Sequence, residues 1–478
     1  MTDEASNLYM RVFFVLGFAW FASWVGLNMQ SLGFRIEQPN LALDYTMGVL
    51  WWFVFAAVIL SFRGESRRLL MIAWTVKFIV VLVLMLFYEQ RYGLDAYTYF
   101  GATRTGQHWM YAGVDFRDDM IPVFRPVYHT ISGYPLLEGE EGGSLGTENF
   151  LRFILIVSML TGPFYHAIKV AFAFMGLLGV WFFYRAVVVG IGQPNSTIFY
   201  LLAFFPSILF WSSILGKDPL QFLFLGLYSY GTAIWLVERR LGASPWIVVG
   251  LAGAYMLRPW ISVMGGAALI FATLLGRCRA WQVGIMFVFA LPILVYVGQK
   301  TLSVFVMGGP DIDLVLNSMQ TISSGYASDA GSGDKDVGGS AADSADVSWP
   351  VAFFAGLFRP LPFDITNPFT ALAAVENTVV LLLAVVALFR CRLGYLRDPL
   401  ILWPLLYTLM WAGTHGFIVL VNFGSGVRYK LQMWPFFLLF LACLTHKEGR
   451  RFLDSRQEAW NGRRESLKPN RLRAHSPA

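Results

Sequence analysis

Long apolar stretches alternate with short polar segments along almost the whole chain. A helix needs about 20 mostly apolar residues to cross the hydrocarbon core of a bilayer. About twelve stretches meet or approach this length when short or tilted spans are allowed. They lie near residues 12–30, 45–62, 69–88, 163–184, 197–214, 220–237, 246–257, 260–275, 281–299, 370–389, 400–421 and 431–445. The pattern predicts an all-α integral membrane protein.

Two long segments, residues 89–150 and 300–369, interrupt this alternation. Short apolar pieces at 150–160 and 349–358 cannot span a bilayer, and a proline follows each of them closely. Such pieces are typical of interfacial or re-entrant helices, because non-helical backbone at membrane depth must be covered by protein or line a cavity. Residues 323–348 are rich in Gly, Ser, Ala and Asp, which predicts a mobile loop rather than a calcium-binding loop.

The basic residues of the short connections predict the orientation of the chain. Cytoplasmic loops carry an excess of lysine and arginine, and every even-numbered predicted span is followed by arginine. Residues 1–445 are therefore expected to form one membrane domain, and residues 446–478 a basic cytoplasmic tail. Both termini are expected in the cytoplasm, and both long segments on the opposite, outward face of the cytoplasmic (inner) membrane.

The composition supports a membrane protein and excludes several other classes. Hydrophobic residues make up 56% of the chain and charged residues only 14%, whereas soluble domains have about 25% charged residues. The net charge of +6 comes from the connections and the tail, so it does not indicate nucleic-acid binding. The three cysteines, Cys278, Cys391 and Cys443, match no zinc or disulfide pattern. The first apolar stretch has no cleavage-site pattern after it and is expected to remain as a span.

Asp95 is the first candidate for chemistry, because it follows the third predicted span directly on the outward side. A carboxylate there can act as a general base on an acceptor hydroxyl, or bind a divalent cation such as Mg²⁺ or Mn²⁺ on a diphosphate. The structural alternative is that Asp95 caps the next helix. Tyr97 and Tyr99 follow it and, with Trp211, are suited to stack on sugar rings or lipid.

Lys217 and Asp218 fall in the tight outward turn between the fifth and sixth predicted spans. Asp218 precedes a proline, an order typical of a helix start, so its predicted role is structural. Lys217 follows Ser212 and Ser213 and is placed to bind phosphate. A lysine that extends to the membrane interface explains the same position equally well.

Further cations lie in outward turns, where the excess of basic residues in cytoplasmic loops does not account for them. Each could anchor a helix at the interface, but together they predict a converging anion site, because arginine suits bidentate phosphate binding. Glu376, roughly two turns into the tenth span, is expected to face a cavity or pair with a cation. The cations are Arg258, Arg359, Arg428 and Lys430.

The histidines and the known soluble motifs add no catalytic candidate. His166 and His415 lie near or within spans, where a lone histidine is more often a hydrogen-bonded packing group than a metal ligand. The sequence has no Ser/His/Asp set, P-loop or dinucleotide-binding motif.

These features together resemble the glycosyltransferase C superfamily and related membrane polysaccharide polymerases. The resemblance rests on the acidic Asp95 at the start of a large outward loop, the many spans, the re-entrant pieces and the late outward Arg428. Residues 205–218 and 422–428 also look like motifs of membrane proteins from exopolysaccharide gene clusters. The superfamily usually places its acidic residue after the first span, so Asp95 as its counterpart would make the first two spans an N-terminal addition.

The resemblance implies an enzyme that transfers sugar from a polyprenyl-linked donor to a glycan or lipid-linked acceptor in cell-surface polysaccharide or glycolipid synthesis. Asp95 would be the base or metal ligand, and the outward cations would bind the phosphates. The alternative is a transporter or flippase of lipid-linked sugars, for which about twelve spans are equally suitable. The gathering of polar residues on one face favours the enzyme, since a transporter is expected to have polar groups at the midplane.

Overall fold

The computed structural model describes most of the predicted spans and parts of the segments 89–150 and 300–369 that are predicted to face outward. The described residues are 40–91, 95–101, 145–238, 240–277, 349–365, 368–392, 394–421 and 423–466, with scattered positions between 17 and 28. Most of the predicted span 12–30, the predicted span 281–299 and the predicted loop 323–348 lie outside these ranges. All regular structure in the described residues is helical, with no strand.

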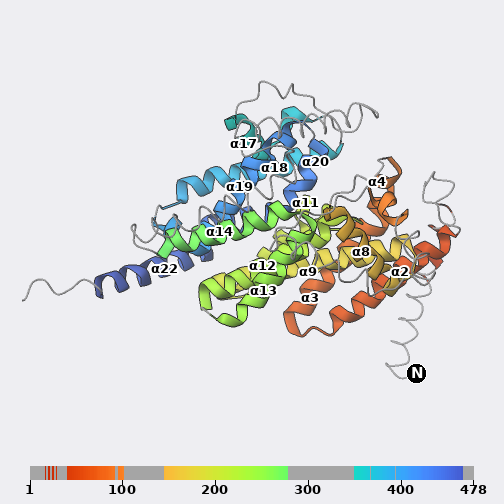
Figure 1. Cartoon of the computed structure of the whole chain (residues 1–478), viewed down its shortest axis with the longest axis horizontal. Helices are drawn as coiled ribbons and strands as arrows, with labels where there is room; N and C mark the ends of the chain where they lie inside the picture. The colour runs from red at the N-terminus through yellow and green to blue at the C-terminus, as the bar shows by residue number, and fades with distance from the viewer. Residues whose placement is uncertain are drawn as a thin grey trace, which may run out of the picture. The chain divides into compact units, whose positions relative to one another are not determined.

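The helices, in chain order, are separated by short connections within each continuously described range (Figure 1). Their bounds are α2 (Leu41–Leu60), α3 (Gly64–Ile79), the π-helical η1 (Val80–Leu84), α4 (Met85–Arg91), α8 (Leu145–Thr161), α9 (Tyr165–Ile191), α10 (Ser196–Phe204), α11 (Pro206–Trp211), α12 (Lys217–Glu238), η3 (Leu241–Ala243), α13 (Ser244–Leu257), α14 (Pro259–Arg277), α17 (Trp349–Phe358), η5 (Pro362–Asp364), α18 (Pro368–Arg390), η6 (Tyr395–Arg397), α19 (Pro399–Val421), α20 (Phe423–Tyr429), η7 (Lys430–Gln432), α21 (Trp434–Thr445) and α22 (Lys447–Ser466).

Several of these helices could cross a membrane. Four are long and apolar enough by length and composition, namely α2, α9, α12 and the Thr370–Arg390 part of α18. A fifth results if Gly426–Gln432 and Trp434–Thr445, which meet at 64°, form one broken span. Other predicted spans coincide with shorter apolar helices such as α13. The all-helical class is therefore confirmed, with four candidate membrane-spanning helices in the described part of the chain.

The predicted short helices and helix breaks are present. The apolar pieces at 150–160 and 349–358 correspond to α8 and α17. Helix α8 ends before Gly162, whose φ of +82° lies in the left-handed region that glycine adopts without steric cost, and Pro163 follows it. Part of the predicted basic tail is also helical, as α22.

The chain divides into two compact units, each of which gathers separate stretches of sequence. The first unit consists of Met1–Tyr184, Phe199–Ser229 and Trp246–Ser262. The second unit consists of Arg185–Ile198, Tyr230–Pro245 and Val263–Ala478.

Aromatic pairing and glycine contacts hold the helices of the first unit together. Trp52 on α2 and Trp74 on α3 donate their indole N–H groups to each other's backbone carbonyls, at 3.3 and 3.1 Å, and their rings stack. A Cβ at Gly226 on α12 would lie 2.8 Å from the carbonyl oxygen of Gly179 on α9. Close helix approach at small residues is typical of membrane bundles. In lipid there is no hydrophobic driving force between apolar side chains, so the helices depend on close van der Waals packing.

In the second unit, α17 packs along α19 through the same kind of contact. A Cβ at Gly416 on α19 would lie 2.1 Å from the carbonyl oxygen of Ala352 on α17, and one at Gly356 would lie 2.9 Å from that of Ala412. Helix α21 packs against both α18 and α19. The short α17 is thus held by the long helices beside it.

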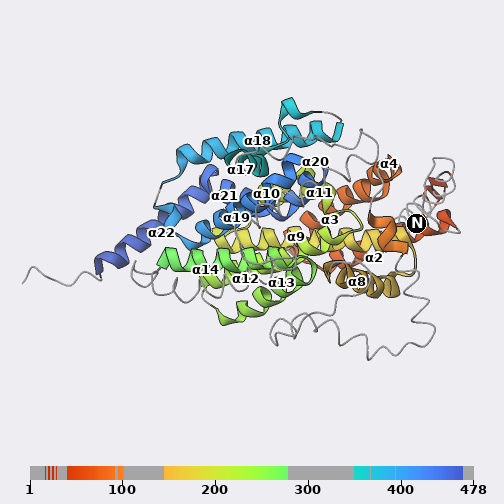
Figure 2. The same ribbon diagram turned by 45° about the horizontal axis from the view of Figure 1, so that its top comes forward.

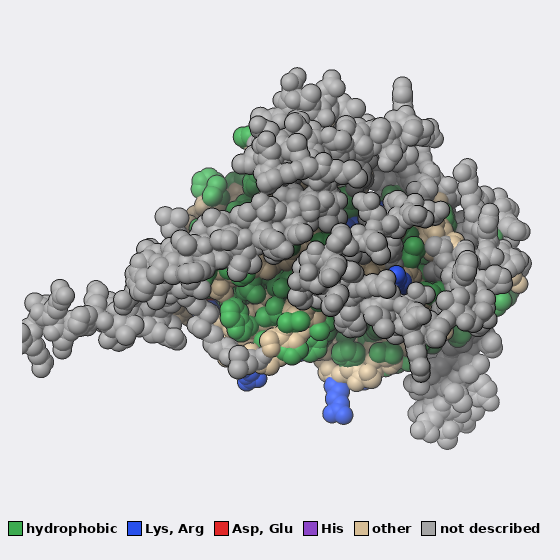
Figure 3. Space-filling view, viewed as in Figure 1, with side chains coloured by type: hydrophobic (Ala, Val, Ile, Leu, Met, Phe, Trp, Pro, Cys, Tyr) green, Lys and Arg blue, Asp and Glu red, His purple; other side chains and the backbone are tan. Residues whose placement is uncertain are grey.

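Large hydrophobic side chains remain exposed on several long helices. On α18, Leu382 is 62% exposed and Phe389 is 85% exposed, and on α13 Val248 is 62% exposed. Hydrophobic side chains form much of the visible described surface in Figure 3. Contiguous apolar surface on a helix is unfavourable in water and is expected on helices that face lipid.

We predict that Gly416→Ala lowers the stability of the protein. The added methyl group clashes with backbone, and overpacking of this kind costs about 1–3 kcal/mol, more than the gain in helix propensity of about 1 kcal/mol. Thermal unfolding of the purified protein in detergent measures the effect. The control is Gly266→Ala in α14, where no atom lies within 4 Å of the added Cβ. Equal unfolding temperatures of the two variants would contradict the packing argument.

Candidate functional site

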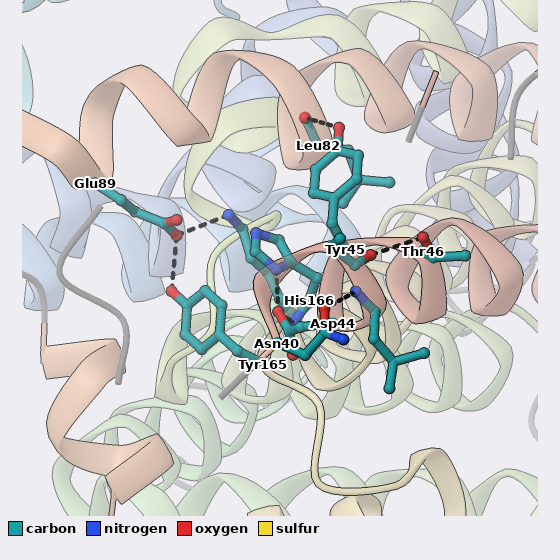
Figure 4. A network of polar contacts seen from close by, with 11 residues as sticks. Asn40, Asp44, Tyr45, Thr46, Leu82, Glu89, Tyr165 and His166 are labelled. Carbon is teal, nitrogen blue, oxygen red and sulfur yellow. Dashed lines mark hydrogen bonds and ion pairs between the residues drawn. The ribbon is translucent and has the colours of Figure 1, made fainter. Parts of the chain in front are cut away.

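The first unit contains two fully buried acid–base pairs, drawn in Figure 4. Asp44, in the first turn of α2, contacts the Nδ1 atom of His166 in the first turn of α9. The same carboxylate oxygen lies 3.4 Å from the backbone nitrogen of His166. Gly48 makes this contact possible, since a Cβ there would lie 2.7 Å from the Cβ of His166. The close approach of α2 and α9 therefore depends on a glycine one turn from the acid.

The second pair joins α4 to α9. Lys169 lies 2.8 Å from Glu89, and neither side chain is exposed. The same carboxylate oxygen accepts a hydrogen bond from the hydroxyl of Tyr165 at 2.9 Å. His166 and Lys169 are three residues apart on α9, so the two pairs occupy one face of that helix.

Buried polar atoms remain in this network without a hydrogen-bond partner among the described residues. They are Asp44 Oδ1, Glu89 Oε2 and His166 Nε2. Most buried polar atoms in proteins are hydrogen-bonded to protein or water. Ionisable groups at membrane depth are costly, so such a cluster indicates a functional or strongly structural role.

A polar turn, residues 212–218, lies between α11 and α12 of the same unit. Lys77, which is buried on α3, donates to the carbonyl and hydroxyl oxygens of Ser212 at 3.1 and 2.7 Å and to the Ser213 hydroxyl at 2.8 Å. Gly176 lets α9 approach the turn, since a Cβ there would lie 2.1 Å from the carbonyl oxygen of Ser212. Two helices, α3 and α9, thus contact the 212–218 turn at its first two residues.

The other end of the 212–218 turn contains the predicted candidates of this unit. The half-buried Lys217 donates to the hydroxyl of Thr147 on α8 at 2.7 Å. The buried Arg258, at the break between α13 and α14, pairs with Asp218 at 2.8 Å. Asp218 therefore has a structural ion pair, and the structure brings the predicted Lys217 and Arg258 to the same short turn.

Two tyrosines of the helical segment that carries Asp95 contact residues of α8 and α9. Asp95 is exposed at the first described position of this segment, residues 95–101. Tyr97 packs on Tyr165, with ring centroids 5.6 Å apart, and Tyr99 packs on Phe150, with centroids 4.9 Å apart.

Phe150 is one helical turn beyond Thr147 on α8, the residue that binds Lys217. The segment that carries Asp95 and the Lys217 side chain therefore contact the same end of α8.

The second unit holds the other predicted candidates. The buried Lys430 donates to the carbonyl oxygens of Leu357 and Arg359 at 3.2 and 2.6 Å and to the amide oxygen of Asn377 at 3.2 Å. An ammonium group has three donors, and these three contacts use them at the C-terminal end of α17. Glu376 is also buried, and its carboxylate attracts the Lys430 ammonium.

Arg359 and Asp364 form a second ion pair in this unit. The guanidinium binds both carboxylate oxygens, one of them at 3.0 Å. Burial disfavours the ionised form of Asp364, but hydrogen bonds from the Arg359 side chain and the Leu361 backbone N–H outweigh it and lower the pKa of this carboxyl. Arg428 is half-buried on α20. The structure thus groups Arg359, Glu376 and Lys430 around the end of α17.

Sequence reasoning missed the most deeply buried ionisable groups, Lys77, Glu89 and Lys169. The available signal was a charged residue inside or at the end of an apolar run, which is expected to face the bundle interior. Both histidines are hydrogen-bonded packing groups in the structure, His166 with Asp44 and His415 with the Thr414 hydroxyl at 2.8 Å.

The described residues include no group of three His, Cys, Asp or Glu side chains that could hold a metal ion. The divalent cation at Asp95 stays a prediction.

No protein-family model, curated protein or solved structure matches this chain. The function is therefore inferred from the site alone.

We predict that Lys169→Met destabilises the protein strongly, because it leaves Glu89 buried without its counter-charge. Breaking a buried pair in this way costs about 3–5 kcal/mol, and the double variant Glu89→Gln/Lys169→Met should recover much of the loss. Thermal unfolding in detergent measures both variants. The control is Arg392→Met, which breaks the exposed pair with Asp454 and should cost less than about 1 kcal/mol. A double variant as unstable as Lys169→Met would argue against the pairing.

Proposed function

We propose that this protein is a membrane glycosyltransferase or polysaccharide polymerase that uses a polyprenyl phosphate- or diphosphate-linked sugar donor. It acts on the outer face of the cytoplasmic membrane, in cell-surface polysaccharide or glycolipid synthesis. The observation that carries the proposal is the 212–218 turn, which contains Lys217, pairs with Arg258 through Asp218, and contacts the same end of α8 as the segment of Asp95. Cations and hydroxyl groups at a fixed turn suit a phosphate group at the membrane surface.

The proposed topology keeps about twelve spans with both termini in the cytoplasm and the long loops outside. In that topology the outward ends of the spans include the first turns of α2 and α9, the helix α4 and the 212–218 turn. The buried acid–base pairs then support the site from within the membrane domain.

In the proposed reaction, the carboxylate of Asp95 takes the proton from an acceptor hydroxyl, and the hydroxyl oxygen attacks the anomeric carbon of the donor sugar. The bond from that carbon to the phosphate oxygen breaks, and the polyprenyl phosphate or diphosphate leaves with the electron pair. Lys217 and Arg258 offset the charge that grows on the phosphate.

The remaining candidates act around this step in the proposal. Arg359 and Arg428 are further proposed phosphate contacts. Lys430 and Glu376 are assigned to holding the end of α17, because the Lys430 donors are engaged there. Tyr97 and Tyr99 position the segment of Asp95 by packing on Tyr165 and Phe150.

A second candidate function is transport of the same lipid-linked sugars, and the network of Figure 4 favours it. Chains of acidic, histidine and lysine side chains within a membrane domain are used for proton relay in transporters. Asp44 with His166 and Glu89 with Lys169 form such a set, which would serve as the outward part of a proton relay that drives substrate across the membrane.

We predict that Lys217→Ala and Asp95→Asn lower sugar transfer by about 100-fold or more, from loss of a phosphate contact and of the general base respectively. The purified chain in liposomes is supplied with a labelled polyprenyl diphosphate-linked sugar and an acceptor, and the labelled product is counted. The control is Arg67→Ala, which removes an exposed cation from the α2–α3 region. Protein levels and unfolding temperatures are matched before rates are compared.

Full activity in both variants would contradict the proposed site. The second candidate predicts a different pattern, namely movement of labelled lipid-linked sugar across the liposome membrane without product. That movement would be abolished by Asp44→Asn. Product formation that Asp44→Asn leaves unchanged would support the enzyme and contradict the transporter.

A further inference from the structure

A basic cavity lies in the second unit, apart from the residues assigned to sugar transfer. Its volume is about 380 Å³, and it lies between the end of α18, the connection that follows α18, and the first turns of α22. Figure 2 shows both helices. Five cationic side chains line it against a single carboxylate, that of Asp454. The cations are Arg390, Arg392, Lys447, Arg450 and Arg451.

The lining side chains are partly fixed by protein contacts. Arg390 donates to the carbonyl oxygen of Thr445 at 2.9 Å. The hydroxyl of Tyr395 donates to Asp454 at 2.6 Å, and Arg392 lies 3.2 Å from the same oxygen. Burial and the neighbouring carboxylate raise the pKa of Tyr395, so the phenol stays a neutral donor. Asp454 is therefore already engaged by two of its neighbours.

The three cations on α22 are not neutralised in this way. Lys447 and Arg451 are exposed, and Nε of Arg450 is buried with no hydrogen-bond partner in the described part of the chain. Positive charge in excess around a hollow of this size is costly without an anion, since like charges repel at short range. The lining of the cavity thus favours binding of an anionic group with several acceptor oxygens.

The cavity opens beside apolar surface. Phe389 lines it and is 85% exposed, and Leu388, the residue before, is 75% exposed. The exposed apolar side chains continue along α18 through Leu382 to Val375. A soluble anion would leave these apolar side chains of α18 exposed to water, whereas the acyl chain of a lipid would cover them.

We infer that this cavity binds the phosphate headgroup of an anionic phospholipid, whose acyl chain lies along the exposed face of α18. Basic pockets next to membrane helices on the cytoplasmic side are suited to anionic lipid headgroups. In the topology proposed above, the ends of α18 and α21 are cytoplasmic, so this site faces the inner leaflet and is separate from the sugar-transfer site.

The test titrates the purified full-length protein in detergent with short-chain phosphatidylglycerol and measures binding by intrinsic tryptophan fluorescence. Phosphatidylcholine of the same chain length and inorganic phosphate are the comparison ligands. Phosphatidylglycerol should bind at least about tenfold more tightly than either. Equal binding of inorganic phosphate would overturn the lipid assignment in favour of a soluble anion.

Two variants test the place of binding. Lys447→Gln/Arg451→Gln removes two exposed cations and should weaken phosphatidylglycerol binding at least about tenfold. Arg450→Gln gives a second, single-site reading if the double variant does not fold. The matched control is Arg67→Gln/Arg68→Gln, two exposed cations at the start of α3, which should bind the lipid as the unmodified chain does. Equal loss in control and cavity variants, or no loss in either cavity variant, would overturn the site.

Discussion

The pairing of buried charges is the constraint on which the described structure depends. A charge held among apolar helices is costly unless an opposite charge or several hydrogen bonds compensate it, and removal of one partner exposes that cost. Helix α9 shows the consequence, because His166 and Lys169 on one of its faces tie it to α2 and α4 through Asp44 and Glu89. Lys77 ties α3 to the 212–218 turn in the same manner. These ion pairs and hydrogen bonds stabilise one arrangement of the helices. Apolar packing alone would define that arrangement less well.

Glycines make the polar ties geometrically possible. Gly48 lets α2 approach His166, and Gly176 lets α9 approach the turn that binds Lys77. In lipid, close helix contact relies on small residues and on interhelical hydrogen bonds, and both occur here at neighbouring positions. Two helices, α3 and α9, thus hold the turn that presents Lys217, as the proposed phosphate site requires.

Local patterns predicted the helices, while long-range contacts decided the site. Apolar runs predicted helices at the observed places, and Gly162 with Pro163 predicted the break after α8, because both signals act within one turn of the chain. The contact of Lys217 with Thr147, or of Lys77 with Ser212, joins residues 70 and 135 positions apart. No periodicity encodes such a partner, so Lys77 and Glu89 were missed, whereas Arg258 and Lys217 were predicted as candidates from their placement in turns.

Both units contain buried charged side chains, but the contacts of these side chains differ between the units. In the second unit, Lys430 and Asp364 engage backbone atoms around the end of α17, which fits a supporting role. In the first unit, Lys217 lies on the 212–218 turn and Arg258 pairs with Asp218 of that turn, and the aromatic segment of Asp95 contacts the same end of α8 as Lys217. Photo-cross-linking of a polyprenyl diphosphate analogue to the purified chain, read by peptide mass spectrometry, tests this assignment directly. The account predicts cross-links at residues 212–218 and at Arg258, reduced by competing donor lipid. Cross-links confined to other segments would contradict it.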